Sequence, residues 1–215
     1  MNEVVIRPLR FTDDVPAMRA FLETLGLRSR IESERGGWVE LVAGRGMIAL
    51  HDAASSDAGA DPGSTTLAFE ADDIEELKDR LVAAGYEDAS IFDEAFGRVL
   101  TASGPDGTKL WIDDRRDDLY GYKLHKSDPD PRWSVTPSLG VSDQAGWERL
   151  LTTLGVGPVR FRAATDFDVQ IELTTAEDLG EVAGRLAASG YAAQPGDGEV
   201  SVVDPDGQLV RVRGA

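Results

Sequence analysis

Few residues in this sequence could do nucleophilic, acid–base or metal chemistry. The chain of 215 residues has two histidines, His51 and His125, and no cysteine. Thiol nucleophiles, disulfides, iron–sulfur clusters and cysteine-ligated zinc are therefore excluded. Any metal site would have to be built mostly from carboxylates.

His51 and three acidic residues, Glu40, Glu70 and Asp113, could form one polar cluster. If all four side chains point into one cavity, they could support acid–base chemistry, bind a displaced cation or attract a cationic ligand. His51 and Glu70 are then the catalytic candidates. The alternative interpretation is that these residues are solvated charges at strand ends, with His51 as a polar contact or a partly exposed side chain.

The charge balance excludes several classes of partner. The chain has 22 Lys and Arg against 39 Asp and Glu, which gives a net charge of −17. A chain this acidic, without a run of basic residues, is repelled by nucleic acids. Its longest apolar stretches, such as 47–50 and 81–84, fall far short of the ~20 residues that a membrane span needs. The N-terminus lacks the features of a signal peptide, so we expect a cytoplasmic protein.

Internal repetition is the strongest pattern in the chain. LETLGL at 22–27 is echoed by LTTLGV at 151–156, RLVAAGY at 80–86 by RLAASGY at 185–191, and Pro-Asp-Gly at 105–107 by Pro-Asp-Gly at 205–207. The two halves are therefore related. We predict a complete domain over 1–115, a polar, proline-broken linker over 116–133 and a degenerate second domain over 134–215.

Each half contains two units in which a strand, an amphipathic helix ending in glycine and further short strands follow one another. The first unit has expected strands at 4–11, 38–42 and 47–50 around a helix at 15–25. The second has a strand at 65–70, a helix ending at 84 and strands near 91, 97–102 and 109–112. The third is cut short after a helix at 147–154 and a strand at 159–163. The fourth has strands at 169–173, 200–203 and 209–212 and a helix at 176–188.

The order and spacing of these motifs resemble the vicinal oxygen chelate superfamily, which includes glyoxalase I, extradiol dioxygenases and bleomycin-resistance proteins. The resemblance covers 3–114 and, in part, 134–213. It implies an α+β fold in which tandem βαβββ units form cupped mixed sheets, with a truncated unit in the second half.

In metallated members of the superfamily, the ligands lie on the first and last strands of the units. The residues at those positions here are Ile6, Ala49, Thr66 and Trp111 in the first half, and Thr136, Gln170 or Ile171, and Arg211 in the second. None is a usual metal ligand. The resemblance therefore implies no metal and no other cofactor.

The cup of the first half is the expected binding site. Strand alternation is expected to turn Ile6, Pro8 and Arg10 inward. The ligand-binding candidates are Trp38, Glu40, His51, Glu70, Phe96, Arg98, Trp111 and Asp113. Trp111 could stack on a planar ligand or pack against the opposite sheet. Arg98 could contact an anion or pair with acids at the surface. Tyr120 and Tyr122 could close the cup or cover the domain junction.

These observations favour a binding protein of the bleomycin-resistance type that holds a small organic molecule, cationic or aromatic, for antibiotic sequestration or metabolite binding. One alternative is a lyase, isomerase or dioxygenase rebuilt around His51, Glu40, Glu70 and Asp113. Another is an interaction module without a ligand. We expect no nucleic-acid or membrane partner and either a monomer or a homodimer.

Overall fold

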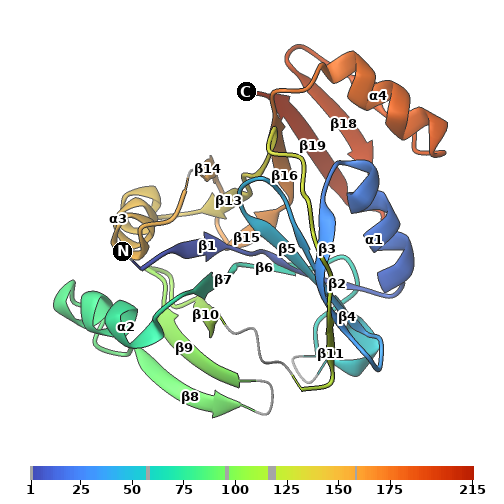
Figure 1. Cartoon of the computed structure of the whole chain (residues 1–215). Helices are drawn as coiled ribbons and strands as arrows, with labels where there is room; N and C mark the ends of the chain where they lie inside the picture. The colour runs from blue at the N-terminus through green and yellow to red at the C-terminus, as the bar shows by residue number, and fades with distance from the viewer. Residues whose placement is uncertain (1, 57–58, 95–96, 116–119, 158) are drawn as a thin grey trace.

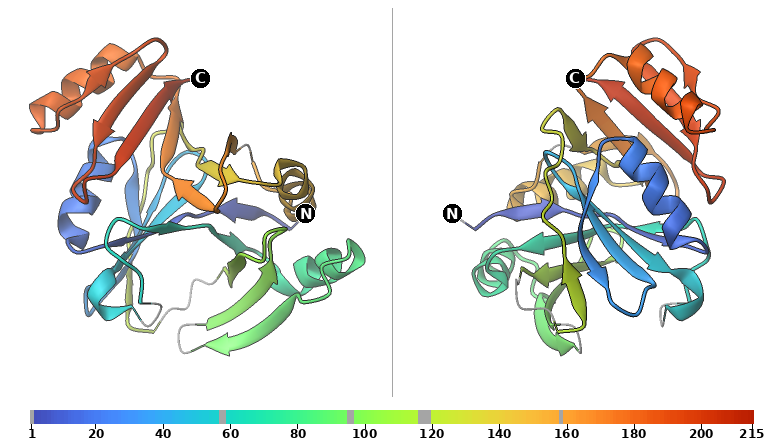
Figure 2. Two further views of the ribbon diagram at one scale, coloured as in Figure 1. Left: turned by 180° about the vertical axis from the view of Figure 1, so that it is seen from behind. Right: turned by 45° about the vertical axis from the view of Figure 1, so that its right-hand side comes forward.

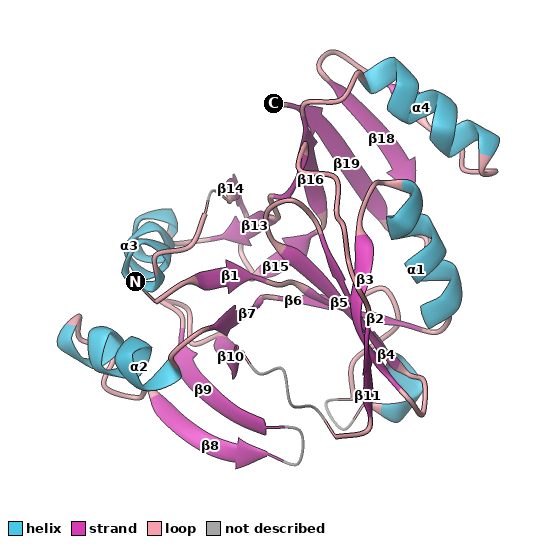
Figure 3. Ribbon diagram, viewed as in Figure 1, coloured by secondary structure: helices cyan, strands magenta, loops and turns pink. Residues whose placement is uncertain are grey.

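The predicted order of four related units is confirmed in the computed structural model of the chain (Figure 3). The structure describes residues 2–56, 59–94, 97–115, 120–157 and 159–215. The first unit contains β1 (Val4–Ile6), β2 (Leu9–Thr12), α1 (Val15–Thr24), β3 (Arg28–Ser33), β4 (Trp38–Val42) and β5 (Met47–Asp52), followed by a short 3₁₀ helix (Ala53–Ser55). The second contains β6 (Thr65–Thr66), β7 (Ala68–Ala71), α2 (Ile74–Ala83), β8 (Ser90–Glu94), β9 (Gly97–Ser103) and β10 (Lys109–Asp114).

The second half begins after β11 (Tyr122–Leu124), which lies within the stretch predicted to be a linker. The third unit contains β12 (Trp133–Val135), β13 (Ser138–Val141), α3 (Gln144–Leu154) and β14 (Arg160–Ala163). The fourth contains β15 (Asp168–Gln170), β16 (Glu172–Thr175), α4 (Leu179–Ala188), β17 (Gln194–Pro195), β18 (Glu199–Val203) and β19 (Leu209–Gly214). The third unit is therefore the shortest of the four, as predicted.

An aspartate begins each of the helices α1 to α4. The capping carboxylates, which accept hydrogen bonds from first-turn backbone N–H groups, belong to Asp14, Asp73, Asp143 and Asp178. The helix expected at 176–188 starts later, at Leu179, because Asp178 is its cap. Gly26 follows α1 with a φ of 89°, and a Cβ there would lie 2.8 Å from Nε1 of Trp133. Glycine is thus required both by the backbone and by the packed indole.

The opening strand of each complete unit is divided between two sheets. β1 pairs antiparallel with β7 of the second unit, whereas β2 pairs parallel with β5 of its own unit. In the same way β6 pairs with β2, and β7 pairs with β10. The described strands of the first half therefore form two sheets, ordered β1-β7-β10-β9-β8 and β11-β3-β4-β5-β2-β6, that exchange their first strands.

This exchange corrects the expected inward face of the first strand. Ile6 is buried in a hydrophobic core, and Arg10 pairs with aspartates of the fourth unit. Arg7 and Leu9 instead line the cavity between the sheets. The prediction was wrong by one residue because the alternation was counted from the superfamily's ligand position at Ile6.

Two hydrophobic cores hold the molecule together, and both are shared between the halves. One joins α2 and its sheet to α3, β13 and β15, and the other joins α1 and its sheet to β12, β16, β18, β19 and α4. Helices α2 and α3 accordingly lie beside each other, as do α1 and α4 (Figures 1 and 2). Each half therefore needs the other to bury its apolar surface.

The repeated sequence motifs lie at this interface. Arg80 of α2 donates a hydrogen bond to the carbonyl of Leu154 at the end of α3, at 3.0 Å. Its repeat partner Arg185 of α4 donates to the carbonyl of Thr24 at the end of α1, at 2.8 Å. A guanidinium at a helix C-terminus satisfies a free carbonyl and complements the helix dipole. The repeat thus encodes reciprocal caps between the halves.

The two Pro-Asp-Gly turns make equivalent contacts. Asp106 accepts a hydrogen bond from Nε1 of Trp147 at 3.3 Å, and Asp206 accepts one from Oγ1 of Thr12 at 2.6 Å. Arg10 lies against the second of these turns. Among the described residues, no helix is long and apolar enough to cross a membrane.

Replacing Arg10 by Met should destabilise the protein strongly. Arg10 is 2% exposed, and its Nη1 lies 3.1 Å from Asp204 and 3.6 Å from Asp206. Burial raises the pKa of Asp204 even with Arg10 beside it. Leaving that carboxylate without its cation should reduce the free energy of unfolding by about 3–5 kcal/mol in urea titrations.

Arg19→Met is the control, because Arg19 pairs with Glu23 on the surface of α1. The Arg19 variant should lose about 1 kcal/mol or less of its free energy of unfolding. The double variant Arg10→Met with Asp204→Leu should recover part of the loss. Equal losses in the Arg10 and Arg19 variants would contradict the importance of this buried pair.

Candidate functional site

A cavity of about 220 Å³ lies between the two sheets of the first half. Its walls come from the β1–β2 segment and from β4, β5, β6, β7, β10 and β11. The lining residues are Arg7, Leu9, Trp38, His51, Thr66, Ala68, Trp111, Asp113 and Tyr122. We call this cavity the cup.

Aromatic side chains make up much of the cup. Trp111 is 42% exposed, although its neighbours Leu110 and Ile112 on β10 are fully buried. Trp38 and Tyr122 line the same cavity, and burial, followed by the charge of Asp113, raises the pKa of the Tyr122 phenol. A half-exposed indole in a concave site offers a flat apolar surface to a ligand.

His51 lies in the cup with one nitrogen already engaged. Its Nδ1 is 2.8 Å from the carbonyl oxygen of Asp52, an acceptor, so this contact assigns the proton to Nδ1. In the neutral form of the ring, Nε2 is then the hydrogen-bond acceptor. The ring also packs edge-on against Trp38, with centroids 5.7 Å apart, and lies 5.9 Å from the ring of Phe11.

Arg7 lies at the base of the cup, inside a ring of carboxylates. Its Nη1 donates to Glu40 at 3.1 Å and lies 4.0 Å from Glu70, while Nη2 donates to Asp113. Burial disfavours the charged guanidinium, but Asp113 and Glu40 outweigh that effect and raise the pKa of Arg7. Arg7 therefore remains a cation, and its charge neutralises the surrounding acids.

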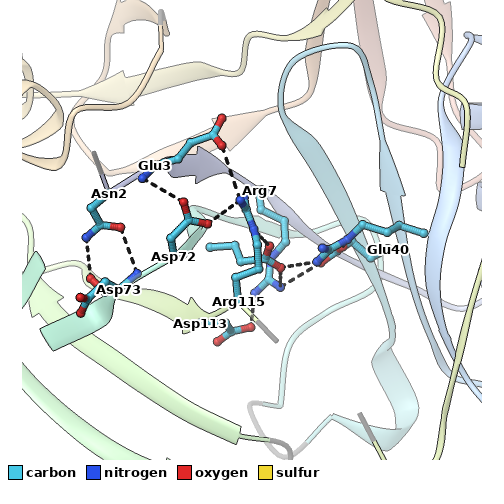
Figure 4. Close-up of polar contacts among 10 residues, drawn as sticks. Asn2, Glu3, Arg7, Glu40, Asp72, Asp73, Asp113 and Arg115 are labelled. Carbon is cyan, nitrogen blue, oxygen red and sulfur yellow. Dashed lines mark hydrogen bonds and ion pairs between the residues drawn. The ribbon is translucent and has the colours of Figure 1, made fainter. Parts of the chain in front are cut away.

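Two more arginines complete this ion network. Arg30 donates to both Glu40 and Glu70. Arg115 donates to Glu70 at 2.5 Å and to Asp72 at 2.6 Å (Figure 4). Burial, with the charge of Glu40, nevertheless raises the pKa of Glu70 above its ordinary value. The carboxylates are thus held by arginines and are not free to serve another cation.

Comparison with known proteins gives likeness in structure alone. No family model and no curated protein matches the sequence. The solved structure of homoprotocatechuate 2,3-dioxygenase from Arthrobacter globiformis matches with a TM-score of 0.65 and 13% identity, over 98% of this chain and 78% of that chain. The 2,3-dioxygenase LapB from Pseudomonas sp. KL28 matches with a TM-score of 0.63 and 12% identity, over 98% and 91%.

A third match is a catechol 2,3-dioxygenase, with a TM-score of 0.64 and 14% identity over 98% of this chain and 86% of that one. The chain has the vicinal oxygen chelate fold. The resemblance predicted from the repeated motifs is therefore confirmed at the level of the fold.

The positions that the superfamily resemblance assigns to metal ligands hold residues that are not usual metal ligands. Of the positions where metallated members have ligands, Ile6 and Ala49 are buried apolar residues, and Thr66 and Trp111 line the cup. The nearby acids Glu40 and Glu70 are paired with arginines. Among the described residues, no group of three His, Cys, Asp or Glu side chains is placed to hold a metal ion.

Most of the predicted site residues lie around the cup of this vicinal oxygen chelate fold. Trp38, His51, Trp111 and Asp113 line it, and Glu40 and Glu70 lie beneath it in the ion network. Their role in ligand binding remains a prediction. Phe96 falls outside the described residues.

Arg98 lies beside the adjoining recess between the sheets and pairs with Glu75 of α2. It is therefore engaged at the surface rather than directed at the cup. Sequence reasoning missed Arg7, Arg30 and Arg115. The available signal for Arg7 was the alternation of the first strand, and Arg30 and Arg115 carried no comparable signal.

Replacing Arg7 by Met should destabilise the protein by about 3–5 kcal/mol at pH 7, because it leaves buried carboxylates short of a cation. The difference in free energy of unfolding between the wild-type protein and the Arg7 variant should become smaller towards pH 5. The folded-state pKa of Glu70 is already raised, and losing Arg7 raises it further. A raised pKa means that the folded state binds more protons than the unfolded state, so stability from this group falls as pH rises through that window.

Urea unfolding of the Arg7 variant at both pH values, with Arg19→Met as the control, measures this effect. The Arg19 variant should show a small loss that changes little between the two pH values. A deficit in the Arg7 variant that is the same at pH 5 and pH 7 would contradict the proposed charge balance of the network.

Proposed function

We propose that the chain binds a small planar aromatic molecule in the cup and does so without a metal ion. The observation that carries this proposal is the half-exposed indole of Trp111 in a cavity that Trp38 and Tyr122 also line. Stacking on rigid aromatic side chains gives a large contact area with little loss of conformational freedom. The lining also provides hydrogen-bonding groups at His51 and Thr66 that could orient the ligand.

Size and charge narrow the class of ligand. A cavity of about 220 Å³ is smaller than most ligand sites, which favours a ligand of one ring or two fused rings. The charged residues of its lining are Arg7 and Asp113, which pair with each other. A ligand therefore meets a nearly neutral site, and an uncharged aromatic suits it better than a strong cation.

Binding is favoured over dioxygenase chemistry by the residues themselves. The similar structures are named as 2,3-dioxygenases. The positions that the resemblance assigns to metal ligands here hold Ile6, Ala49, Thr66 and Trp111. Sequestration of an antibiotic and binding of a metabolite both fit such a site. We also propose that the protein is cytoplasmic.

Replacing Trp111 by Ala should abolish the binding of planar aromatics. We would screen neutral one- and two-ring aromatics, such as 2-naphthol, and cationic analogues by thermal shift and ligand-observed NMR. A compound at 100-fold over its dissociation constant should stabilise the wild-type protein by about 2.7 kcal/mol. Phe92→Ala is the matched control, because Phe92 is 48% exposed on β8 and does not line the cup.

The proposal fails if no aromatic compound stabilises the wild-type protein, or if Trp111→Ala and Phe92→Ala reduce binding equally. A preference for cations would contradict the inference that the paired Arg7 and Asp113 leave the site nearly neutral. The enzyme hypothesis would be favoured instead if the protein converted a bound compound. That conversion should be lost in His51→Ala and should depend on a stoichiometric divalent ion.

A further inference from the structure

A second hollow of about 740 Å³ lies on the other side of the ion network. It is bounded by β1, by the turn between β4 and β5, by β12 and by the segment that follows α3. Arg30 and Arg115 line it and reach from it into the network that closes the base of the cup. We call this hollow the groove; the ion network separates it from the cup.

The groove has an excess of positive charge in an acidic protein. Its charged lining residues are Arg30, Arg45, Arg115 and Glu3. Arg30 and Arg115 are already paired with carboxylates of the network. The side chain of Arg45 has no hydrogen-bond or ion-pair partner among the described residues, so its charge is available to a ligand.

The backbone of Arg45 is held firmly, even though its side chain is unpaired. Its N–H donates to the carbonyl of Trp133 at 3.1 Å, and its carbonyl accepts from the N–H of Val135 at 2.8 Å. The flanking glycines are packed closely against the second half of the chain. A Cβ at Gly44 would lie 2.5 Å from Pro131, and one at Gly46 would lie 2.9 Å from Val135. The turn is therefore fixed against the second half of the chain.

The side chain of Arg45 extends towards the opposite wall of the groove. Its Cδ lies 3.9 Å from where a Cβ at Gly157 would be, and Gly157 leaves that wall open. A guanidinium on a fixed turn has less conformational freedom to lose when it binds an anion. Its planar donors suit carboxylate, sulfonate and phosphate oxygens.

The remaining walls of the groove contain apolar side chains beside polar groups. Val5, Val42, Met47 and Val135 face the same space as Arg45. One unpaired cation beside an apolar wall complements a molecule that carries one anionic group on an apolar body. A fully polar anion would leave this wall unused, and a neutral hydrocarbon would leave Arg45 unpaired.

We propose that the groove is a second binding site, distinct from the cup, for a small organic anion with an apolar body, and that Arg45 contacts the anionic group. The site depends on both halves of the chain, because Arg45 is positioned by β12. It does not depend on the function proposed for the cup.

The test uses two fluorescent probes with the same apolar body. 8-Anilinonaphthalene-1-sulfonate carries an anionic group, and N-phenyl-1-naphthylamine does not. Wild-type protein should bind the sulfonate saturably and at least tenfold more tightly than the neutral amine. Arg45→Glu should weaken binding of the sulfonate at least tenfold, whereas Arg45→Lys should retain most of it.

Arg35→Glu is the matched control, because Arg35 is also an exposed arginine on a turn and the change in net charge is the same. It should leave the affinity for the sulfonate within about twofold, since long-range effects of surface charge are screened at physiological salt. Circular dichroism and urea unfolding would show that each variant is folded before its affinity is compared.

Three results would overturn the proposal. The first is the absence of saturable binding of the sulfonate to wild-type protein. The second is equal weakening by Arg45→Glu and Arg35→Glu, which would mean a general charge effect. The third is loss of sulfonate binding in Trp111→Ala with no loss in Arg45→Glu, which would place the probe in the cup. Failure of aromatic binding to the cup would leave the groove result unaffected.

Discussion

The burial of Arg7 is the constraint on which the rest of the first half depends. A guanidinium removed from water must be surrounded by carboxylates, and those carboxylates must in turn be neutralised. Glu40, Glu70 and Asp113 meet the first requirement, and Arg30 and Arg115 help to meet the second. The resulting network fills the middle of the two-sheet domain. It engages the acids that the sequence suggested as a cation site, and it separates the cup from the groove.

Much of the fold could be predicted from the sequence because the signals were local and repeated. Helical periodicity, aspartate caps and terminal glycines each recur, and their order was enough to indicate the vicinal oxygen chelate fold. The exchange of first strands between sheets could not be predicted in this way. It depends on pairing between β1 and β7, which are distant in sequence, and it reversed the face on which Ile6 and Arg7 lie.

The candidate site was only partly predictable. Trp38, His51, Trp111 and Asp113 were placed by strand alternation, which is reliable where a strand lies in one sheet. The partners of Glu40 and Glu70 were missed because an arginine on another strand leaves no trace in local periodicity. Three carboxylates therefore suggested a cation site, although the cations were already present in the chain. Arg45 was missed for a similar reason. The sequence does not show which arginines lack an ion-pair partner in the folded chain.

The reciprocal caps made by Arg80 and Arg185 place the two halves in the relation of subunits in a symmetric dimer. Here, however, the partners are covalently joined, so each half meets the other at the high effective concentration set by a short connection. Such an interface need not be strong enough to assemble separate chains. The second half therefore needs a less extensive interface than a separate subunit would. It can have fewer strands in its third unit and still complete the cores that support the cup.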